Sequence, residues 1–182
     1  MIDDVEVLFT ETEIRAKVQE LGRRITADYQ GEELLVVGIL KGAFVFMADL
    51  VRCIGLPVTM DFMDLSSYGA SDHSSGEVRI LKDLEQPIEG RHVLIVEDII
   101  DTGVTLKYIL EILQRRQPKS LKICTFLDKP SRRKSDVVSD YNGFSIPDHF
   151  VVGYGLDYAE KYRNLAGVYK LKPEAIQRGV GS

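Results

Sequence analysis

A short run in the middle of the chain carries residue types that suit phosphate and sugar binding. Four aliphatic residues at 93–96 are followed directly by Glu97 and Asp98, and then by Asp101. The run closes with four loop residues, Thr102, Gly103, Val104 and Thr105. Backbone N–H groups of such a loop, at the positive end of a helix, suit a phosphate monoester. The adjacent carboxylates can accept hydrogen bonds from vicinal hydroxyls or contact Mg²⁺.

The residues around this run predict a buried parallel strand that leads through a tight loop into a helix. The stretch 93–97, whose first four residues are apolar, is typical of a strand covered on both faces. Over 105–116, the apolar residues recur at helical spacing and share one face, namely Leu106, Ile109, Leu110 and Leu113. Ligands of open α/β sheets bind in the crevice at the carboxyl ends of the strands. We therefore expect a binding site at 97–105.

Two common nucleotide-binding motifs are missing from the chain. No G-x-x-x-x-G-K-[ST] sequence occurs, so the acidic strand end has no phosphate-binding partner of the P-loop type. The pair Gly153 and Gly155 is followed by no third glycine at the spacing of a dinucleotide-binding loop. Both of these nucleotide-binding classes are therefore disfavoured.

The rest of the chain predicts an alternation of strands and helices. Thr10 and Glu13 have the spacing of a capping box, and the helix after them buries Ile14, Val18, Leu21 and Ile25. Further helices are expected over about 42–53 and 105–116, and strands over 34–40, 58–65, 78–81, 93–97, 121–127, 150–154 and 168–171. Residues 66–77 and 128–148 are polar and are expected to form loops. This alternation predicts a parallel sheet.

The composition is that of a single globular domain over 1–182. Hydrophobic residues make up 45% of the chain, and 23 basic against 28 acidic side chains give a net charge of −5, which argues against a nucleic-acid partner. No apolar stretch approaches the roughly 20 residues that span a bilayer. The acidic start and two separated cysteines, Cys53 and Cys124, predict a cytoplasmic protein with reduced thiols.

The run at 93–105 resembles the phosphoribosyl-pyrophosphate signature of the type I phosphoribosyltransferases. The remainder resembles the hypoxanthine/guanine branch of that family from about residue 5 to 171. The further matching segments are Leu40-Lys41-Gly42, Ser67-Tyr68, Leu127-Asp128-Lys129, and 150–154 with Asp157 and Arg163. The resemblance implies an α/β fold: a mostly parallel, twisted sheet flanked by helices over about 15–147. A small hood lobe would come from the N-terminal segment and about 148–182.

The resemblance also implies a reaction and a pyrophosphate site. Members of the branch move the 5-phosphoribosyl group of phosphoribosyl pyrophosphate to a purine nitrogen and release pyrophosphate. Lys41, Gly42 and Arg163 match residues that contact the pyrophosphate, and the peptide bond before the lysine can be cis in the family. The matched Mg²⁺ ligands are Glu97, Asp98 and Asp157.

A second group of residues matches the family's purine site. Asp101 matches the proposed general base, which takes the proton from the purine N7. Lys129 matches a lysine that donates to O6 and so favours 6-oxopurines such as hypoxanthine and guanine. Phe150 matches a ring that stacks on the base, and Val151 supplies backbone contacts to its edge. Ser67 and Tyr68 match a lid that excludes water.

Several alternatives stay open at this stage. Val104 stands where some relatives carry a basic residue, which predicts weaker local charge without loss of phosphate binding. Xanthine also has O6 and remains a possible substrate, whereas Lys129 opposes adenine and pyrimidines. An RNA-binding regulator with the same fold would need a basic face, but the basic cluster at 132–134 is short enough to be a solvated turn. The resemblance implies a homodimer or homotetramer.

Overall fold

The acidic run belongs to a long strand inside a six-stranded sheet. The computed structural model describes residues 4–67 and 78–179, and β5 (His92–Ile100) lies near the middle of the sheet order β4-β3-β2-β5-β6-β7. The neighbouring strands are β2 (Leu34–Leu40), β3 (Val58–Ser67), β4 (Val78–Lys82), β6 (Ser120–Asp128) and β7 (Tyr141–Ser145). Within the described residues, β4 pairs antiparallel with β3 and the other neighbouring pairs of this sheet are parallel.

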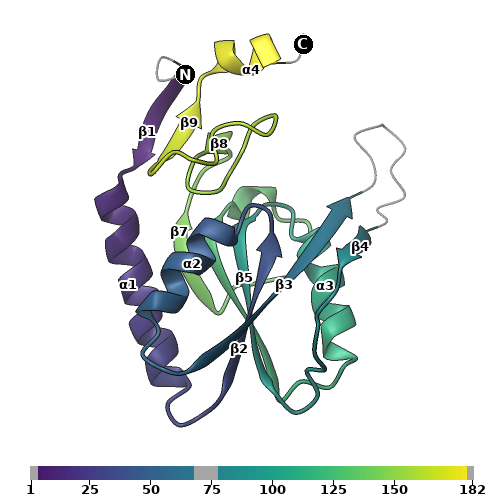
Figure 1. Cartoon of the computed structure of the whole chain (residues 1–182). Helices are drawn as coiled ribbons and strands as arrows, with labels where there is room; N and C mark the ends of the chain where they lie inside the picture. Colours follow the sequence, from purple (N-terminus) through teal and green to yellow (C-terminus); the bar gives the residue numbers. More distant parts are fainter. Residues whose placement is uncertain (1–3, 68–77, 180–182) are drawn as a thin grey trace.

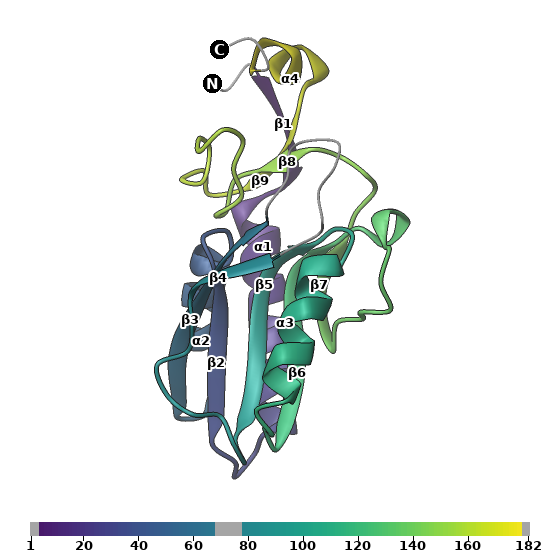
Figure 2. The same ribbon diagram turned by 90° about the vertical axis from the view of Figure 1, so that its right-hand side faces the viewer.

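Alternating side chains of β5 face two separate apolar layers. Leu94 and Val96 pack in the cluster that includes α1 (Glu11–Asp28) and α2 (Phe44–Cys53). Val93 and Ile95 pack in the cluster of α3 (Val104–Gln114) on the opposite face. Figures 1 and 2 show α1 and α2 on one side of the sheet and α3 on the other. A strand buried on both faces needs an unbroken apolar stretch, which explains the sequence at 93–96.

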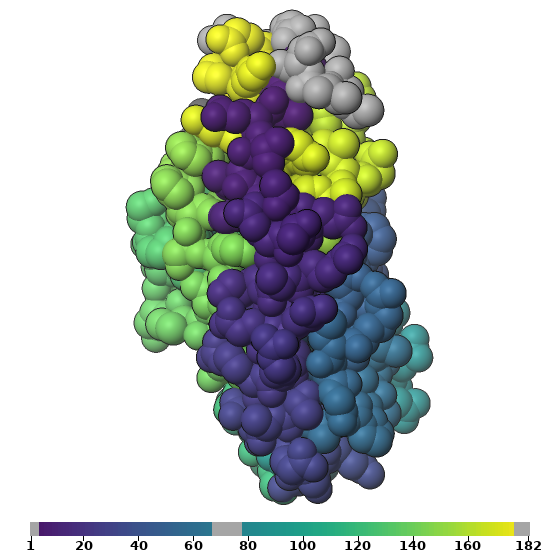
Figure 3. Space-filling model, turned by 90° about the vertical axis from the view of Figure 1, so that its left-hand side faces the viewer, coloured from purple at the N-terminus to yellow at the C-terminus, as the bar shows by residue number. Residues whose placement is uncertain are grey.

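The first helix begins at the predicted capping box. The Thr10 hydroxyl accepts a hydrogen bond from the Glu13 backbone N–H, and the Glu13 carboxylate accepts one from the Thr10 backbone N–H at 2.8 Å. The four apolar positions of this helix that the spacing predicts are all buried, which confirms the prediction. Figure 3 shows the helix running along one side of the molecule, with α2 against its lower half.

A second, three-stranded sheet forms the hood above the carboxyl ends of the main strands (Figure 1). Its strands are β1 (Val5–Phe9), β9 (Val168–Leu171) and β8 (Val151–Val152), in that order, and α4 (Pro173–Gly179) follows. Val151, Tyr154 and Val168 of this region are buried in the same apolar cluster as α1 and α2. The hood therefore packs directly on the main body.

The predicted fold class is confirmed, and several elements differ from the sequence prediction. The strands β1 and β7 and the helix α4 were not expected, and β7 lies inside the segment 128–148 that was predicted as a loop. The expected strand at 150–154 is limited to β8, because the chain turns at Gly153 and Gly155, which both have positive φ. Within the described residues, no helix is long and apolar enough to cross a membrane.

Candidate active site

The loop between β5 and α3 makes a small cavity at the carboxyl end of the sheet. The cavity measures about 140 Å³ and is lined by Glu97, Ile99, Ile100, Asp101, Thr102, Gly103, Thr105 and Leu106. Gly103 precedes α3 with φ 76°, a left-handed conformation that favours glycine, and a side chain there would overlap Ser135. The 132–135 segment thus covers the loop from outside, and the Lys134 N–H donates to the Thr102 carbonyl at 2.9 Å.

The two adjacent carboxylates of β5 lie close enough to share a hydrogen bond, and each also reaches a different neighbouring segment. Glu97 lines the cavity beside α3, whereas Asp98 reaches the backbone before α2, where a Cβ on Gly42 would overlap its carboxylate. Burial, and then the neighbouring Asp98 charge, hold the pKa of Glu97 well above its ordinary value. Burial also raises the pKa of Asp98, although the Ile99 N–H donates to its carboxylate at 2.7 Å. This end of β5 is therefore costly to ionise fully without a bound cation or hydroxyl donors.

The residues that match the pyrophosphate site lie beside Asp98. The Leu40–Lys41 peptide bond is cis, in agreement with the resemblance. The Lys41 ammonium lies 3.0 Å from a Glu160 oxygen, and Arg163 lies 2.9 Å from Asp157 and 3.3 Å from Glu160. The Arg163 Nε is buried and has no hydrogen-bond partner within the described residues. Two cations and a spare N–H donor suit an anionic ligand.

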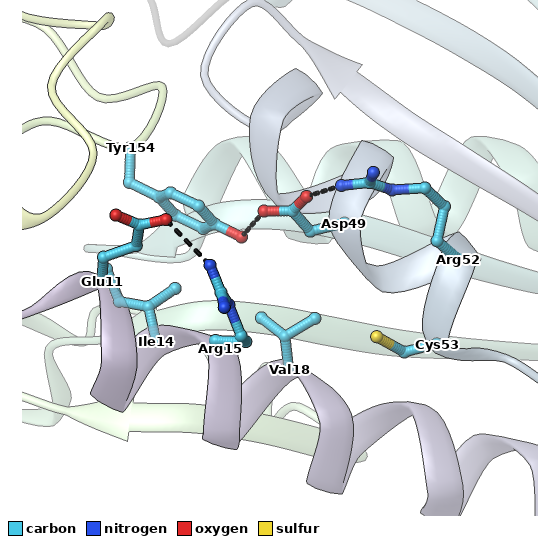
Figure 4. A pocket seen from close by; sticks show the side chains of 8 residues that line it. All are labelled: Glu11, Ile14, Arg15, Val18, Asp49, Arg52, Cys53 and Tyr154. Atoms are coloured by element: carbon cyan, nitrogen blue, oxygen red, sulfur yellow. Dashed lines mark hydrogen bonds and ion pairs between the residues drawn. The ribbon is translucent and has the colours of Figure 1, made fainter.

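A tyrosine of the hood connects this region to α2 through a hydrogen bond. Tyr154 has φ 51° and stands between two glycines, and a Cβ on Gly155 would overlap the Gly42 carbonyl. The Tyr154 hydroxyl donates to Asp49 at 2.7 Å, and Asp49 also pairs with Arg52 (Figure 4). These contacts wall a pocket of about 390 Å³ whose other lining residues are Glu11, Ile14, Arg15, Val18 and Cys53. The hood is thereby held against the helix that starts at the predicted pyrophosphate site.

Of the residues that match the purine site, Lys129 directly follows β6, which pairs with β5 on the flank opposite β2. Asp101 pairs with the Arg132 guanidinium at 3.0 Å, and Arg132 also lies 3.6 Å from Asp148. Lys129 is only 7% exposed, and its ammonium lies 3.5 Å from the same Asp148. Phe150, two residues further along, is 48% exposed and makes an edge-on contact with Tyr158, while Val151 is buried. A half-exposed ring, two residues after the Asp148 that pairs with the Lys129 ammonium, suits a flat base with a carbonyl oxygen.

The predicted magnesium ligands are not gathered into a cage. Within the described residues no group of three or more His, Cys, Asp or Glu side chains could hold a metal, and Asp157 pairs with Arg163. Mg²⁺ commonly binds through one or two carboxylates while substrate phosphates and water complete its shell. Glu97 and Asp98 fit this mode. Of the predicted lid, Ser67 ends β3 and Tyr68 lies outside the described residues.

Three side chains of the site were missed by the sequence interpretation: Arg132, Asp148 and Glu160. The basic cluster at 132–134 was interpreted as short enough to be a solvated turn. Arg132 and Lys134 are indeed exposed, but Arg133 is mostly buried against Asp128, and Arg132 pairs with Asp101. The available signal was the presence of two arginines directly after the Lys129 segment, opposite an acidic strand end.

Comparisons with known proteins give a family match over most of the chain. The phosphoribosyl transferase domain matches residues 5–159. A hypoxanthine-guanine phosphoribosyltransferase of Bacillus subtilis is 57% identical over 97% of this chain and 99% of its own length. The bifunctional protein TilS/HprT of Listeria innocua is 54% identical over 96% of this chain, which spans 27% of that protein. A crystal structure of a hypoxanthine phosphoribosyltransferase from Staphylococcus aureus has a TM-score of 0.93 and 54% identity, covering 100% of this chain and 97% of its own.

Proposed function

The chain belongs to the phosphoribosyltransferase family, in the branch of the hypoxanthine-guanine enzymes, and we propose that it transfers the 5-phosphoribosyl group of phosphoribosyl pyrophosphate to hypoxanthine and guanine. The products would be IMP or GMP and pyrophosphate. The observation that carries the proposal is the position of β5, whose end contacts Gly42 on one side through Asp98 and Arg132 on the other through Asp101. The end of one strand thus lies beside the residues assigned to the leaving group and beside those assigned to the base.

The donor would bind along the loop after β5. Backbone N–H groups at the start of α3 suit its 5-phosphate, with Thr102 and Thr105 as hydroxyl donors. The two carboxylates Glu97 and Asp98 would accept hydrogen bonds from the ribose hydroxyls. Mg²⁺, held by these carboxylates or Asp157 together with substrate oxygens and water, would supply positive charge against the pyrophosphate.

Bond breaking would be assisted on the side of Lys41 and Arg163. As the bond from the anomeric carbon to the pyrophosphate oxygen breaks, negative charge grows on the leaving group and positive charge grows on the ribose. The two cations stabilise the first charge, and the carboxylates of β5 stabilise the second. Closure over this centre would exclude water, which could otherwise hydrolyse the donor.

Bond formation would take place on the side of Lys129. A purine nitrogen supplies the electron pair for the new bond to the anomeric carbon, while the N7 proton passes to the Asp101 carboxylate. Arg132 holds this carboxylate in place. The Lys129 ammonium donates to O6, which favours 6-oxopurines over adenine, whose amino group is itself a donor. Xanthine carries the same O6 and is the second candidate base.

The test is a panel of bases offered to purified protein with Mg²⁺ and phosphoribosyl pyrophosphate. Hypoxanthine and guanine should give nucleotide, and adenine and uracil should not. Asp101→Asn should lower the rate by about 100-fold or more, because general base catalysis typically contributes this much. Asp83→Asn is the matched control, since Asp83 pairs with Arg116 and is 45% exposed, against 43% for Asp101. Preference for xanthine would overturn the base assignment, and no nucleotide from any base would overturn the proposed reaction.

We propose a homodimer or homotetramer, which sedimentation would test, and a cytoplasmic location. We also propose a single domain over 1–182, with the core at about 15–147 and the hood outside it.

A further inference from the structure

The Glu160 carboxylate lies where an anionic ligand is expected. One of its oxygens is 3.0 Å from the Lys41 ammonium, and the other is 3.3 Å from Arg163. These are the two cations that the proposed function assigns to the pyrophosphate. Because the contact with Lys41 spans 119 residues of sequence, it depends on the packing of the hood against the main body. The hydrogen bond between Glu160 and Lys41 also lowers the pKa of the Glu160 carboxyl group, so this group is charged at neutral pH.

The backbone of the 157–162 loop presents this carboxylate. Ala159 and Glu160 have φ 50° and 59°, a left-handed conformation that non-glycine residues seldom adopt. The Glu160 N–H donates to the Asp157 carboxylate at 2.9 Å, and a bridge between Tyr158 and Lys161 closes the loop. The position of Glu160 is thus set by its loop as well as by the attraction of the cations.

We propose that Glu160 is a built-in counter-ion of the pyrophosphate site, which competes with the pyrophosphate group for Lys41 and Arg163. The inference rests on the proposed function. An incoming pyrophosphate would displace the carboxylate from both cations, and the carboxylate would return as the product leaves. Glu160 would therefore weaken binding of donor and product alike, and it would keep the empty site close to electrical neutrality.

The size of the effect follows from the exposure of the pair. The side chains of Lys41 and Glu160 are 63% and 67% exposed, so solvent screens their attraction. Removing the competing charge should therefore tighten pyrophosphate binding by a modest factor, about two- to fivefold. The gain should shrink in high salt, since ions screen exposed charges.

The experiment compares Glu160→Gln with the unchanged protein in calorimetric titrations with magnesium pyrophosphate. The same proteins are assayed for the KM of phosphoribosyl pyrophosphate and of hypoxanthine. Glu32→Gln is the matched control, because Glu32 lies 3.2 Å from Lys119 and 3.4 Å from His92 at the opposite end of the sheet. Gln keeps the size of the side chain, and Glu160→Ala provides a second removal of the charge.

The expected result is a two- to fivefold fall in the pyrophosphate Kd and in the KM of the donor. The KM of hypoxanthine should stay unchanged, and the difference from the unchanged protein should diminish at 0.5 M salt, where the Debye length is only about 4 Å. Unchanged or weaker pyrophosphate binding in both Glu160 variants, with normal nucleotide formation, would overturn the inference alone. Failure of the unchanged protein to bind pyrophosphate and to form nucleotide would overturn the proposed function, and the inference with it.

Discussion

Glu97 and Asp98 place two carboxyl groups next to each other at the end of a strand that is otherwise apolar. Burial raises the pKa of both groups, and the Asp98 charge raises that of Glu97 further, whereas the hydrogen bond with Glu97 lowers that of Asp98. A site that binds ribose hydroxyls and Mg²⁺ requires these charges when the substrate arrives. The pair therefore trades stability of the empty protein for affinity toward its ligands, as is common at functional sites.

Glu97→Gln tests this trade-off through its pH dependence. The pKa of Glu97 in the folded chain is raised well above its ordinary value of 4.5. The stability of the folded state therefore decreases as the pH rises from the ordinary pKa through the raised pKa, because the buried carboxyl group must then ionise. The variant, which is neutral at every pH, should have a higher Tm than the unchanged protein at pH 8 and about the same Tm at pH 4. Nucleotide formation should fall.

Glu20→Gln serves as a control in the same thermal scans, because the pKa of Glu20 is lowered whereas that of Glu97 is raised. The hydrogen bond from Lys17 lowers the pKa of Glu20. The Glu20 carboxylate therefore stabilises the fold at pH values above its ordinary pKa, and this stabilisation is lost in acid. This variant should not raise the Tm at pH 8. A lower Tm for Glu97→Gln at pH 8 would mean that the carboxylate stabilises the fold, contrary to the trade-off.

At the scale of elements, the site depends on the packing of the hood loop against α2. Tyr154 is 6% exposed, and its hydroxyl donates to Asp49 in the middle of that helix. The same loop continues to Gly155, whose carbonyl accepts from Arg163 at 2.8 Å and which packs on the Gly42 carbonyl. A shift of the loop would thus move both sides of the predicted pyrophosphate site.

Tyr154→Phe should therefore affect stability and donor binding together. Loss of this part-buried hydrogen bond to a carboxylate should cost about 1–3 kcal/mol, and the KM of phosphoribosyl pyrophosphate should rise. Tyr141→Phe is the matched control, because Tyr141 is 1% exposed and donates to Asp28 at 2.6 Å between β7 and α1, away from the site. Thermal unfolding and steady-state kinetics would check both variants. Equal changes of KM would show that Tyr154 acts only on stability.

The sequence predicts those elements whose apolar pattern is continuous or periodic. The strand at 93–97 and the helix after Thr10 are examples, and both occur in the structure. The strand β7 (Tyr141–Ser145) was missed because Asn142 and Gly143 interrupt its pattern, and it forms through pairing with β6. Among the acidic residues of the site, Glu97, Asp98 and Asp101 stand in a recognisable run. Glu160 carries no such local signal, because its partner Lys41 is far away in the sequence.

At the scale of the whole molecule, the hood shares its core with the main body. Val151, Tyr154, Leu156 and Val168 are buried in the cluster that also contains the inner faces of α1 and α2. The hood strands come from both ends of the described chain, since β1 pairs with β9 and β9 with β8. Such an arrangement predicts one cooperative unit, because no hood strand can leave without exposing apolar surface of the body.

Val168→Ala tests whether the chain unfolds as one domain. Val168 is fully buried, so its truncation should cost about 2 kcal/mol, or about 4–8 °C in Tm at this chain length. Circular dichroism and tyrosine fluorescence should report one coincident transition at the lower temperature. Val138→Ala is the control, because Val138 is 79% exposed and should leave the Tm unchanged. An early transition confined to the hood would contradict the single domain. Activity would then be lost before the main sheet unfolds, because Arg163 and Phe150 lie on hood segments beside the active site.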